Sequence, residues 1–218
     1  MEKDAEIYCN LDFIEISTVT TCSMSYKDPL GDDFFFPLDE QLEVLGSALI
    51  SALEKSRDLS SSPEEKKEFT ENAPDILSGK FREWYDGYHQ KWLNNKPERR
   101  LFEENLRRQR ESEWLNNILK CYGYKNEKAL YKNMQACSAT EESEEIKFFS
   151  QGKDESSKGT SGFKIKSASP PEVIGAAVKY SVARCTGKGA DLVAGKLFPD
   201  GVPDTFEDYL KSLNLPKA

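Results

Sequence analysis

Two segments near opposite ends of the chain carry the same amphipathic helix pattern. EVLGSALISALEKS (43–56) aligns without gaps with EVIGAAVKYSVARC (172–185), at an offset of 129 residues, and each follows a short aromatic strand pattern. A glycine inside a helix costs about 1 kcal/mol of helix propensity but permits close approach to a neighbour. Gly46 and Gly175 therefore predict two helices that lie close to a sheet. A duplicated unit and two independent amphipathic helices both explain the similarity.

Strand patterns accompany both helices. Residues 5–26 are rich in Ile, Thr, Val and aromatic residues with partial alternation, which predicts one or two strands. Further strands are predicted at 34–36, 137–141, 145–150 and 162–167. Helices are predicted at about 40–56 with Asp39 as N-cap, from the capping box Ser169-Pro170-Pro171-Glu172 to about Cys185, and at Thr205–Leu213 with Asp204 and Glu207 as caps.

The middle of the chain is predicted to be helical after a polar connection. Phe81, Trp84, Tyr85, Tyr88 and Trp92 recur at helical spacing, a second helix follows Pro97 to about Leu119, and a short one lies near Glu127–Met134. We therefore predict an α+β fold with a small antiparallel or mixed sheet built from N- and C-terminal strands. The expected organisation is a single domain, 1–218, divided into 1–56, 57–78 (polar connection), 79–135 (helical) and 136–218.

Composition excludes most catalytic chemistry. The chain has one histidine, His89, no CxxC, and no glycine-rich nucleotide-binding or nucleophile-elbow motif. Five scattered cysteines are typical of reduced, buried thiols in a cytosol. The charged N-terminus lacks a signal region, and no apolar stretch is long enough to cross a membrane. We expect a cytoplasmic protein with no catalytic site, metal or cofactor.

Charge is distributed unevenly along the chain. Residues 1–78 carry 18 acidic and 6 basic side chains, a net charge of −12, whereas residues 79–135 carry 8 acidic and 13 basic ones. An acidic region of this size repels nucleic acid and membrane surfaces and attracts a cationic partner. A solvated surface that keeps the chain soluble would show the same excess.

The segment from about Ala129 to Cys185 resembles a known family. A helix ending in LYKNM, a strand pair around a polar loop, and SPPEVIGAAVKYSVARC (169–185) are similar to immunity proteins encoded beside contact-dependent growth inhibition toxins, the CdiI type. The resemblance covers roughly the last 90 residues well and the first half in outline. The loop at 151–161 departs from it because it has few aromatic residues.

This resemblance implies a non-catalytic protein that binds the C-terminal toxin domain of a delivered effector and blocks its active site. Many such toxins are basic nucleases that cleave tRNA or DNA, and the acidic N-terminal third would complement a cationic face. The predicted toxin contacts are two acidic clusters. They are Asp32, Asp33, Asp39 and Glu40, and separately Glu141, Glu142, Glu144 and Glu145. For any one of these residues, the alternative is an ordinary solvated carboxylate with no role in binding.

Two other functions fit parts of the sequence. The arginine-rich helix 99–110, with aromatic residues nearby, has the composition of an RNA-binding surface, but five interleaved glutamates at 98–113 balance its five arginines. Paired carboxylates at Asp32/Asp33 or Glu144/Glu145 could serve a hydrolase. Adjacent strand residues point to opposite faces, however, which argues against a shared site. No direct contact with nucleic acid is expected.

Overall fold

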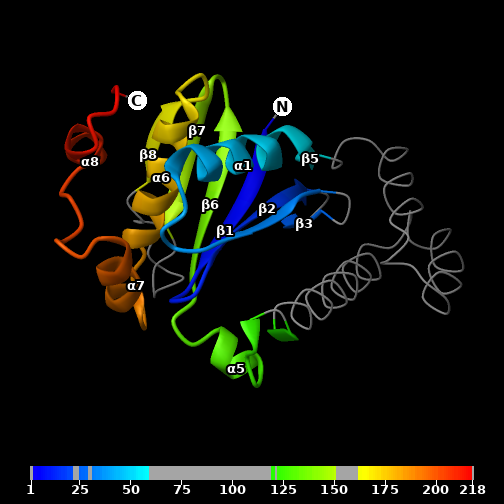
Figure 1. The fold of residues 1–218 in the computed structure, drawn as a ribbon. Coiled ribbons are helices and arrows are strands. Elements are labelled where there is room, and N and C mark those ends of the chain that lie inside the picture. Colours follow the sequence, from blue (N-terminus) through cyan, green and yellow to red (C-terminus); the bar gives the residue numbers. More distant parts are fainter. Residues whose placement is uncertain are drawn as a thin grey trace, which may run out of the picture.

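A computed structural model describes residues 2–21, 25–28, 31–58, 119–120, 122–150 and 162–217. In these residues, one sheet is covered by helices (Figure 1), which confirms the α+β fold and the pairing of strands from both ends of the chain. The predicted helices of 79–118, His89 and the loop 151–161 lie outside the described residues.

The sheet joins the two ends of the chain through one central pair of strands. Its strands are β1 (Lys3–Cys9), β2 (Ile14–Thr21), β3 (Ser25–Lys27), β4 (Asp33–Phe36), β5 (Arg57–Asp58), β6 (Gln135–Glu142), β7 (Glu145–Ser150) and β8 (Phe163–Lys166). The order is β3-β2-β1-β6-β7-β8, with β4 and β5 also paired to β2. Only β5 runs parallel to its neighbour among the described pairs. The sheet is therefore mixed, which is one of the two arrangements predicted.

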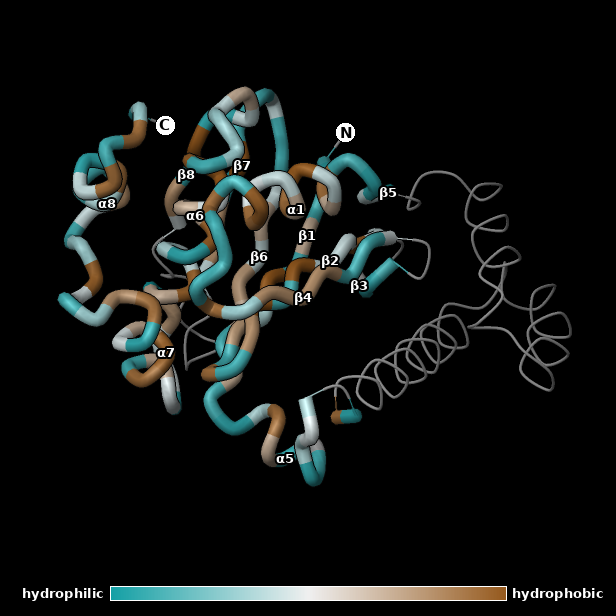
Figure 2. Tube along the Cα trace, viewed as in Figure 1, coloured by the Kyte–Doolittle hydropathy of each residue, from teal (hydrophilic) through white to brown (hydrophobic). Residues whose placement is uncertain are grey.

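Two helices cover one face of this sheet. The described helices are α1 (Leu42–Lys55), α5 (Glu127–Leu130), α6 (Pro171–Ala183), α7 (Ala190–Leu197) and α8 (Phe206–Ser212). Figure 1 shows α1 and α6 on the same side of the strands, with α7 and α8 beyond α6. Leu45 and Leu49 of α1 and Ile174 and Val178 of α6 are fully buried. Hydrophobic residues gather in the central strands and these two helices (Figure 2).

The two halves of the sheet repeat one order of elements. With the short strands β3 and β5 set aside, the chain forms β1, β2, β4 and α1 in the first half, and β6, β7, β8 and α6 in the second. Because β1 and β6 are antiparallel neighbours at the centre, the halves are related by an approximate two-fold axis between them. The helix similarity seen in the sequence is thus part of a repeated strand–strand–strand–helix plan.

Gly46 and Gly175 lie where the two helices cross. A Cβ on Gly46 would lie 1.8 Å from the carbonyl oxygen of Pro171, and a Cβ on Gly175 would lie 1.9 Å from that of Leu42. Each glycine thus faces the first residue of the other helix. The prediction that these glycines bring their helices close to the sheet is wrong, because the backbone they approach belongs to the partner helix.

The predicted helices at the two ends are confirmed, but their caps differ. The N-cap of α1 is Gln41, not Asp39, and the N-cap of α6 is Pro170; neither helix has a side-chain cap. Ser169 and Glu172 therefore do not form the predicted capping box. A cap requires an extended backbone at one defined residue, and composition alone does not fix that residue.

The C-terminal region differs from the prediction in two ways: the cap of α8 is shifted, and one helix, α7, was not predicted. In α8 the cap is Thr205, whose hydroxyl accepts a hydrogen bond from the Asp208 amide at 3.1 Å, so the cap lies one residue after Asp204. The helix α7 begins directly after the glycine-containing segment 186–189, in a stretch for which the sequence predicted no element. It is held by packing, with Val193 fully buried and Lys196 Nζ donating to the Leu11 carbonyl at 2.6 Å.

Candidate functional site

The first predicted acidic cluster is divided by a strand. Asp32 and Asp33 lie at the start of β4, and Asp39 and Glu40 lie in the turn between β4 and α1. The four residues of β4 place about 10 Å of extended chain between the two pairs. The structure therefore presents two separate acidic pairs instead of one cluster.

Asp32 is occupied by its own chain. Its carboxylate accepts hydrogen bonds from Lys55 Nζ at 2.5 Å and Ser51 Oγ at 2.8 Å, both on α1. The hydrogen bond from Lys55 is the largest influence on the Asp32 carboxyl and lowers its pKa. Asp33 is exposed, and its side chain makes no hydrogen bond or ion pair with described residues. Asp33 is thus the more available carboxylate of this pair.

Asp39 and Glu40 differ in the same way. Asp39 is exposed, and its carboxylate has no hydrogen-bond partner among the described residues. Glu40 is partly buried; its carboxylate accepts the Gln41 amide at 2.9 Å, and its backbone carbonyl accepts Lys179 Nζ at 2.8 Å. Burial lowers the pKa of Lys179, while the negative charges of Asp39 and Glu40 oppose that shift. The charge of this pair is therefore partly compensated from α6.

The second predicted cluster lies around the β6–β7 turn and is mostly neutralised. The ion pairs join Glu141 to Lys3 at 2.7 Å, Glu142 to Lys147 at 2.5 Å and Glu145 to Lys164 at 2.7 Å. The hydrogen bond from Lys147 lowers the pKa of the Glu142 carboxyl.

Glu144 is the exception in this cluster. It sits in the turn with a left-handed φ of 69°, is exposed, and has no side-chain partner in the described part of the chain. Glu144 and Glu145 do not form a paired-carboxylate site, since Glu145 is bound to Lys164.

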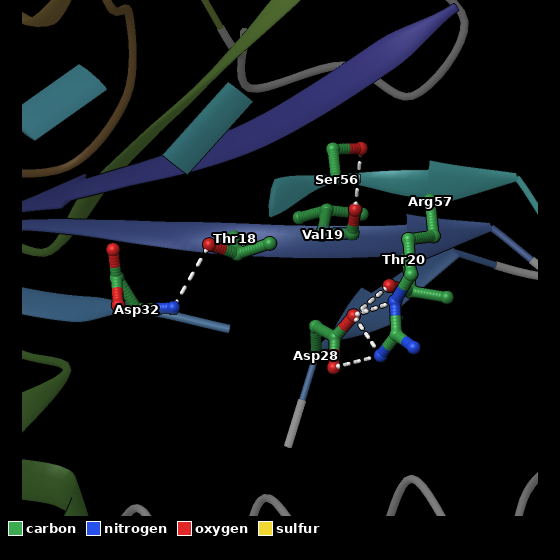
Figure 3. Close-up of polar contacts among 7 residues, drawn as sticks. All are labelled: Thr18, Val19, Thr20, Asp28, Asp32, Ser56 and Arg57. Carbon is green, nitrogen blue, oxygen red and sulfur yellow. Dashed lines mark hydrogen bonds and ion pairs between the residues drawn. The ribbon is translucent and has the colours of Figure 1, made fainter. Parts of the chain in front are cut away.

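A buried polar network on the first half of the sheet was not predicted. Asp28 is 2% exposed and receives two nitrogens of Arg57, with Nη2 at 2.8 Å from Oδ1 and Nε at 3.0 Å from Oδ2, together with the Thr20 hydroxyl (Figure 3). Ser56 Oγ donates to the Val19 carbonyl at 2.7 Å and accepts the Asp4 amide at 2.8 Å. This network ties the end of α1 to β1 and β2, so its role is structural.

No signal in the sequence marks Asp28 and Arg57 as partners. They are 29 residues apart, and Arg57 begins the segment predicted as a polar connection. Only the short parallel pairing of β5 with β2 brings Arg57 over Thr20.

The cysteines behave as buried hydrophobic residues. Cys9, Cys137 and Cys185 are buried free thiols, as predicted, while Cys22 and Cys121 lie outside the described residues. Cys137 Sγ lies 3.3 Å from Cys185 Sγ, and burial raises the pKa of the Cys137 thiol. A raised pKa keeps the thiol protonated and unreactive.

The described residues contain no group of three or more His, Cys, Asp or Glu side chains that could hold a metal ion. None of the helices in that part of the chain is long and apolar enough to span a bilayer. The arginine-rich helix 99–110, on which the RNA-binding alternative depends, lies outside it.

The decisive comparison is with protein families. The family model described as "CDI immunity protein" (CdiI) matches residues 3–185. The chain belongs to the CDI immunity protein family. The match takes in β1 to β4 and α1 as well as the C-terminal segment that carries the sequence resemblance, so the family assignment covers both halves of the sheet.

Solved structures share this CdiI fold. A protein of unknown function, NMB0488, from Neisseria meningitidis has a TM-score of 0.61 at 21% identity, over 85% of this chain and 96% of that one. The CdiA-CT/CdiI toxin and immunity complex from Yersinia pseudotuberculosis gives a TM-score of 0.60 at 22% identity, over 85% of this chain and 98% of that one. No curated protein matches the chain.

Proposed function

We propose that this CdiI-family chain binds the C-terminal toxin domain of a contact-dependent growth inhibition effector in the cytoplasm and neutralises it. The family match over residues 3–185 carries the proposal. The shared fold with the chain from a toxin and immunity complex supports it. Inhibition is by covering the active site or substrate surface of the toxin, without catalysis by this chain.

The proposed toxin is a cationic nuclease that cleaves tRNA or DNA. A nuclease attracts phosphate, so the face that binds its substrate is positive. The net charge of −12 in residues 1–78 is complementary to such a face. Complementary charge mainly raises the association rate and selects the partner, which suits a protein that must act before damage accumulates.

Among the eight predicted contacts, the structure favours three. Asp33, Asp39 and Glu144 are exposed and make no ion pair with described residues. The remaining carboxylates form hydrogen bonds within the chain, so a cationic partner would have to displace a lysine, a serine or a backbone amide. We propose that Asp33, Asp39 and Glu144 provide the charge that attracts the toxin.

The test is a calorimetric titration with the toxin domain encoded immediately upstream, paired with an assay of its nuclease activity. We expect tight binding that weakens as salt rises, and loss of nuclease activity at equimolar ratio. Asp33→Lys and Asp39→Lys should each slow association several-fold at low salt.

Glu207→Lys provides the matched control. Glu207 is an exposed carboxylate on α8, beyond the residues that the family model matches. Equal slowing by this variant would show that only net charge matters and would remove Asp33 and Asp39 from the site. Absence of binding at micromolar concentration would overturn the proposed function for this pair.

A further inference from the structure

The segment that leads into β6 carries exposed lysines and tyrosines on an acidic protein. We call it the lysine–tyrosine lobe: Lys120, Tyr122, Lys125, Lys128, Tyr131 and Lys132. All six side chains are exposed, and residues 119–134 contain only one acidic residue, Glu127. The lobe precedes Gln135, the first residue of β6, whereas the β6–β7 turn with its glutamates follows Glu142 at the other end of that strand.

The lysines of the lobe differ from most other lysines in the structure. Elsewhere, six described lysines form ion pairs with carboxylates: Lys3, Lys27, Lys55, Lys147, Lys164 and Lys211. Within the described ranges, no carboxylate pairs with Lys120, Lys125, Lys128 or Lys132. A chain with a net charge of −8 has carboxylates in excess, so four lysines within 13 residues that lack an ion pair with any described side chain leave a local positive field.

Tyr122 and the neighbouring Tyr124 contact the segment between β1 and β2. The Tyr122 ring lies against Phe13, with 4.5 Å between ring centroids, and remains 37% exposed. Tyr124 Oη accepts a hydrogen bond from Asn10 Nδ2 at 2.9 Å and donates one to the Asp12 carboxylate. These contacts fix the lobe to the β1–β2 turn. Tyr131 is 43% exposed, one residue before Lys132.

A surface that binds single-stranded nucleic acid combines two elements, exposed aromatic rings and nearby cations. The cations contact phosphates, and the rings stack on bases whatever the sequence. We propose that the lysine–tyrosine lobe binds single-stranded nucleic acid, with its four lysines on the phosphates and Tyr131 stacked on a base. This is a local exception to the expectation that the acidic chain avoids nucleic acid, and it does not depend on the proposed toxin.

The charge part of the proposal is tested by the salt dependence of binding. Fluorescence anisotropy would follow the full-length chain binding a labelled 12-nucleotide oligouridine from 25 to 200 mM salt. Four phosphate contacts predict a slope of log K against log salt of about −3, because each contact on a single strand contributes about −0.7. Lys128→Gln/Lys132→Gln should weaken binding and reduce the slope to about −1.4.

The matched control changes the same charge elsewhere. Lys164→Gln/Lys166→Gln removes two exposed lysines from β8, which borders the opposite end of the sheet beside Glu145. It should leave RNA affinity within about twofold of wild type, apart from the general effect of net charge. Equal weakening by the two double variants would overturn the proposal. A thermal melt of each variant checks that it is folded.

The stacking part is tested at Tyr131. Tyr131→Ala should lower RNA affinity about tenfold, whereas Tyr131→Phe, which keeps the ring, should bind as wild type does. Heparin and phosphatidylserine vesicles serve as anionic probes without bases. If they bind as tightly as the oligonucleotide and Tyr131→Ala has no effect on RNA binding, the lobe is a general anion or membrane surface and the proposal is wrong.

Discussion

The two halves of the sheet share one backbone plan but differ on the face that points away from α1 and α6. In β2, all seven residues from Ile14 to Thr20 are buried, including the outward-facing Glu15 and Ser17. In the corresponding β7, burial alternates, and the outward-facing Lys147 and Phe149 are accessible to solvent. The inner faces of both halves are therefore apolar and buried, while their outer faces differ in burial.

The polar groups of the first half illustrate this specialisation. Glu15 is fully buried, accepts a hydrogen bond from Ser17 Oγ at 3.0 Å, and forms an ion pair with Lys27. Asp28 is likewise buried against Arg57. In the second half, the Lys147–Glu142 pair is solvent-accessible on both sides. A buried ion pair and an exposed one thus contribute very differently to the free energy of unfolding, because burial removes the water that competes for the charges.

The largest expected effect comes from the two faces of β7. Phe148 is fully buried in the core and Phe149, its neighbour, is 42% exposed on the outer face. Phe148→Ala should lower the free energy of unfolding by about 3–5 kcal/mol through the lost burial and the cavity left behind. Phe149→Ala should change it by less than about 0.5 kcal/mol. Urea unfolding measures both, and similar values would contradict the description of β7 as one-sided.

The next largest difference in the free energy of unfolding is expected between a buried and an exposed ion pair. Arg57→Met leaves Asp28 buried without its guanidinium, and the expected loss is about 3 kcal/mol. Lys147→Met removes one partner of an exposed pair, with an expected change of less than about 0.5 kcal/mol. Denaturant unfolding of the two variants at one salt concentration gives the comparison. A large loss in Lys147→Met would show that the outer face of β7 is also covered.

Substitutions of the two glycines at the helix crossing should lower the free energy of unfolding by almost equal amounts. Gly46→Ala and Gly175→Ala each force a Cβ onto a backbone carbonyl of the partner helix, and each should cost about 2–3 kcal/mol. Gly195→Ala in α7 is the control, because its Cβ would meet no atom within 4 Å. That change should stabilise by about 0.5–1 kcal/mol through helix propensity. Thermal unfolding that reports very different costs for Gly46 and Gly175 would break the two-fold relation.

The smallest effect concerns the pH dependence contributed by Asp32. The hydrogen bond from Lys55 lowers the pKa of Asp32 in the folded protein, so its stabilisation is present above about pH 4 and is lost as pH falls further. Lys55→Gln should therefore reduce stability at pH 6 by less than about 1 kcal/mol and flatten the loss of stability below pH 4. Unfolding curves from pH 2 to 6 would show this, and an unchanged acid limb would remove Lys55 as the cause.

Much of the order of strands and helices could be predicted from the sequence, because each element depends on the pattern of residues within its own segment. Residues 137–141 and 145–150 were predicted as strands and form β6 and β7, and the apolar period of residues 40–56 predicted α1. Caps were less predictable, since Gln41 and Pro170 occupy positions that favour other residues. The missed helix α7 is short and contains Gly195, so packing of Val193 outweighs its weak propensity.

The candidate site was predicted only as a set of residues. Composition locates the acidic residues but not their partners, because Lys55, Lys3 and Lys164 come from distant parts of the chain. Among the described residues, Asp33, Asp39 and Glu144 are the predicted carboxylates without a side-chain partner, which no local pattern in the sequence predicts. The residues of the lysine–tyrosine lobe can likewise be found in the sequence, but only the structure shows that its four lysines pair with no described carboxylate.

The sequence by itself determined the strand and helix periods, the charge imbalance and the likeness of the two end helices, because these depend on neighbours along the chain. The tertiary structure alone decided that β1 pairs with β6, that Gly46 and Gly175 meet the partner helix, and that Asp28 is buried against Arg57. Those outcomes depend on contacts between residues far apart in the chain, where close packing and desolvation set the energies.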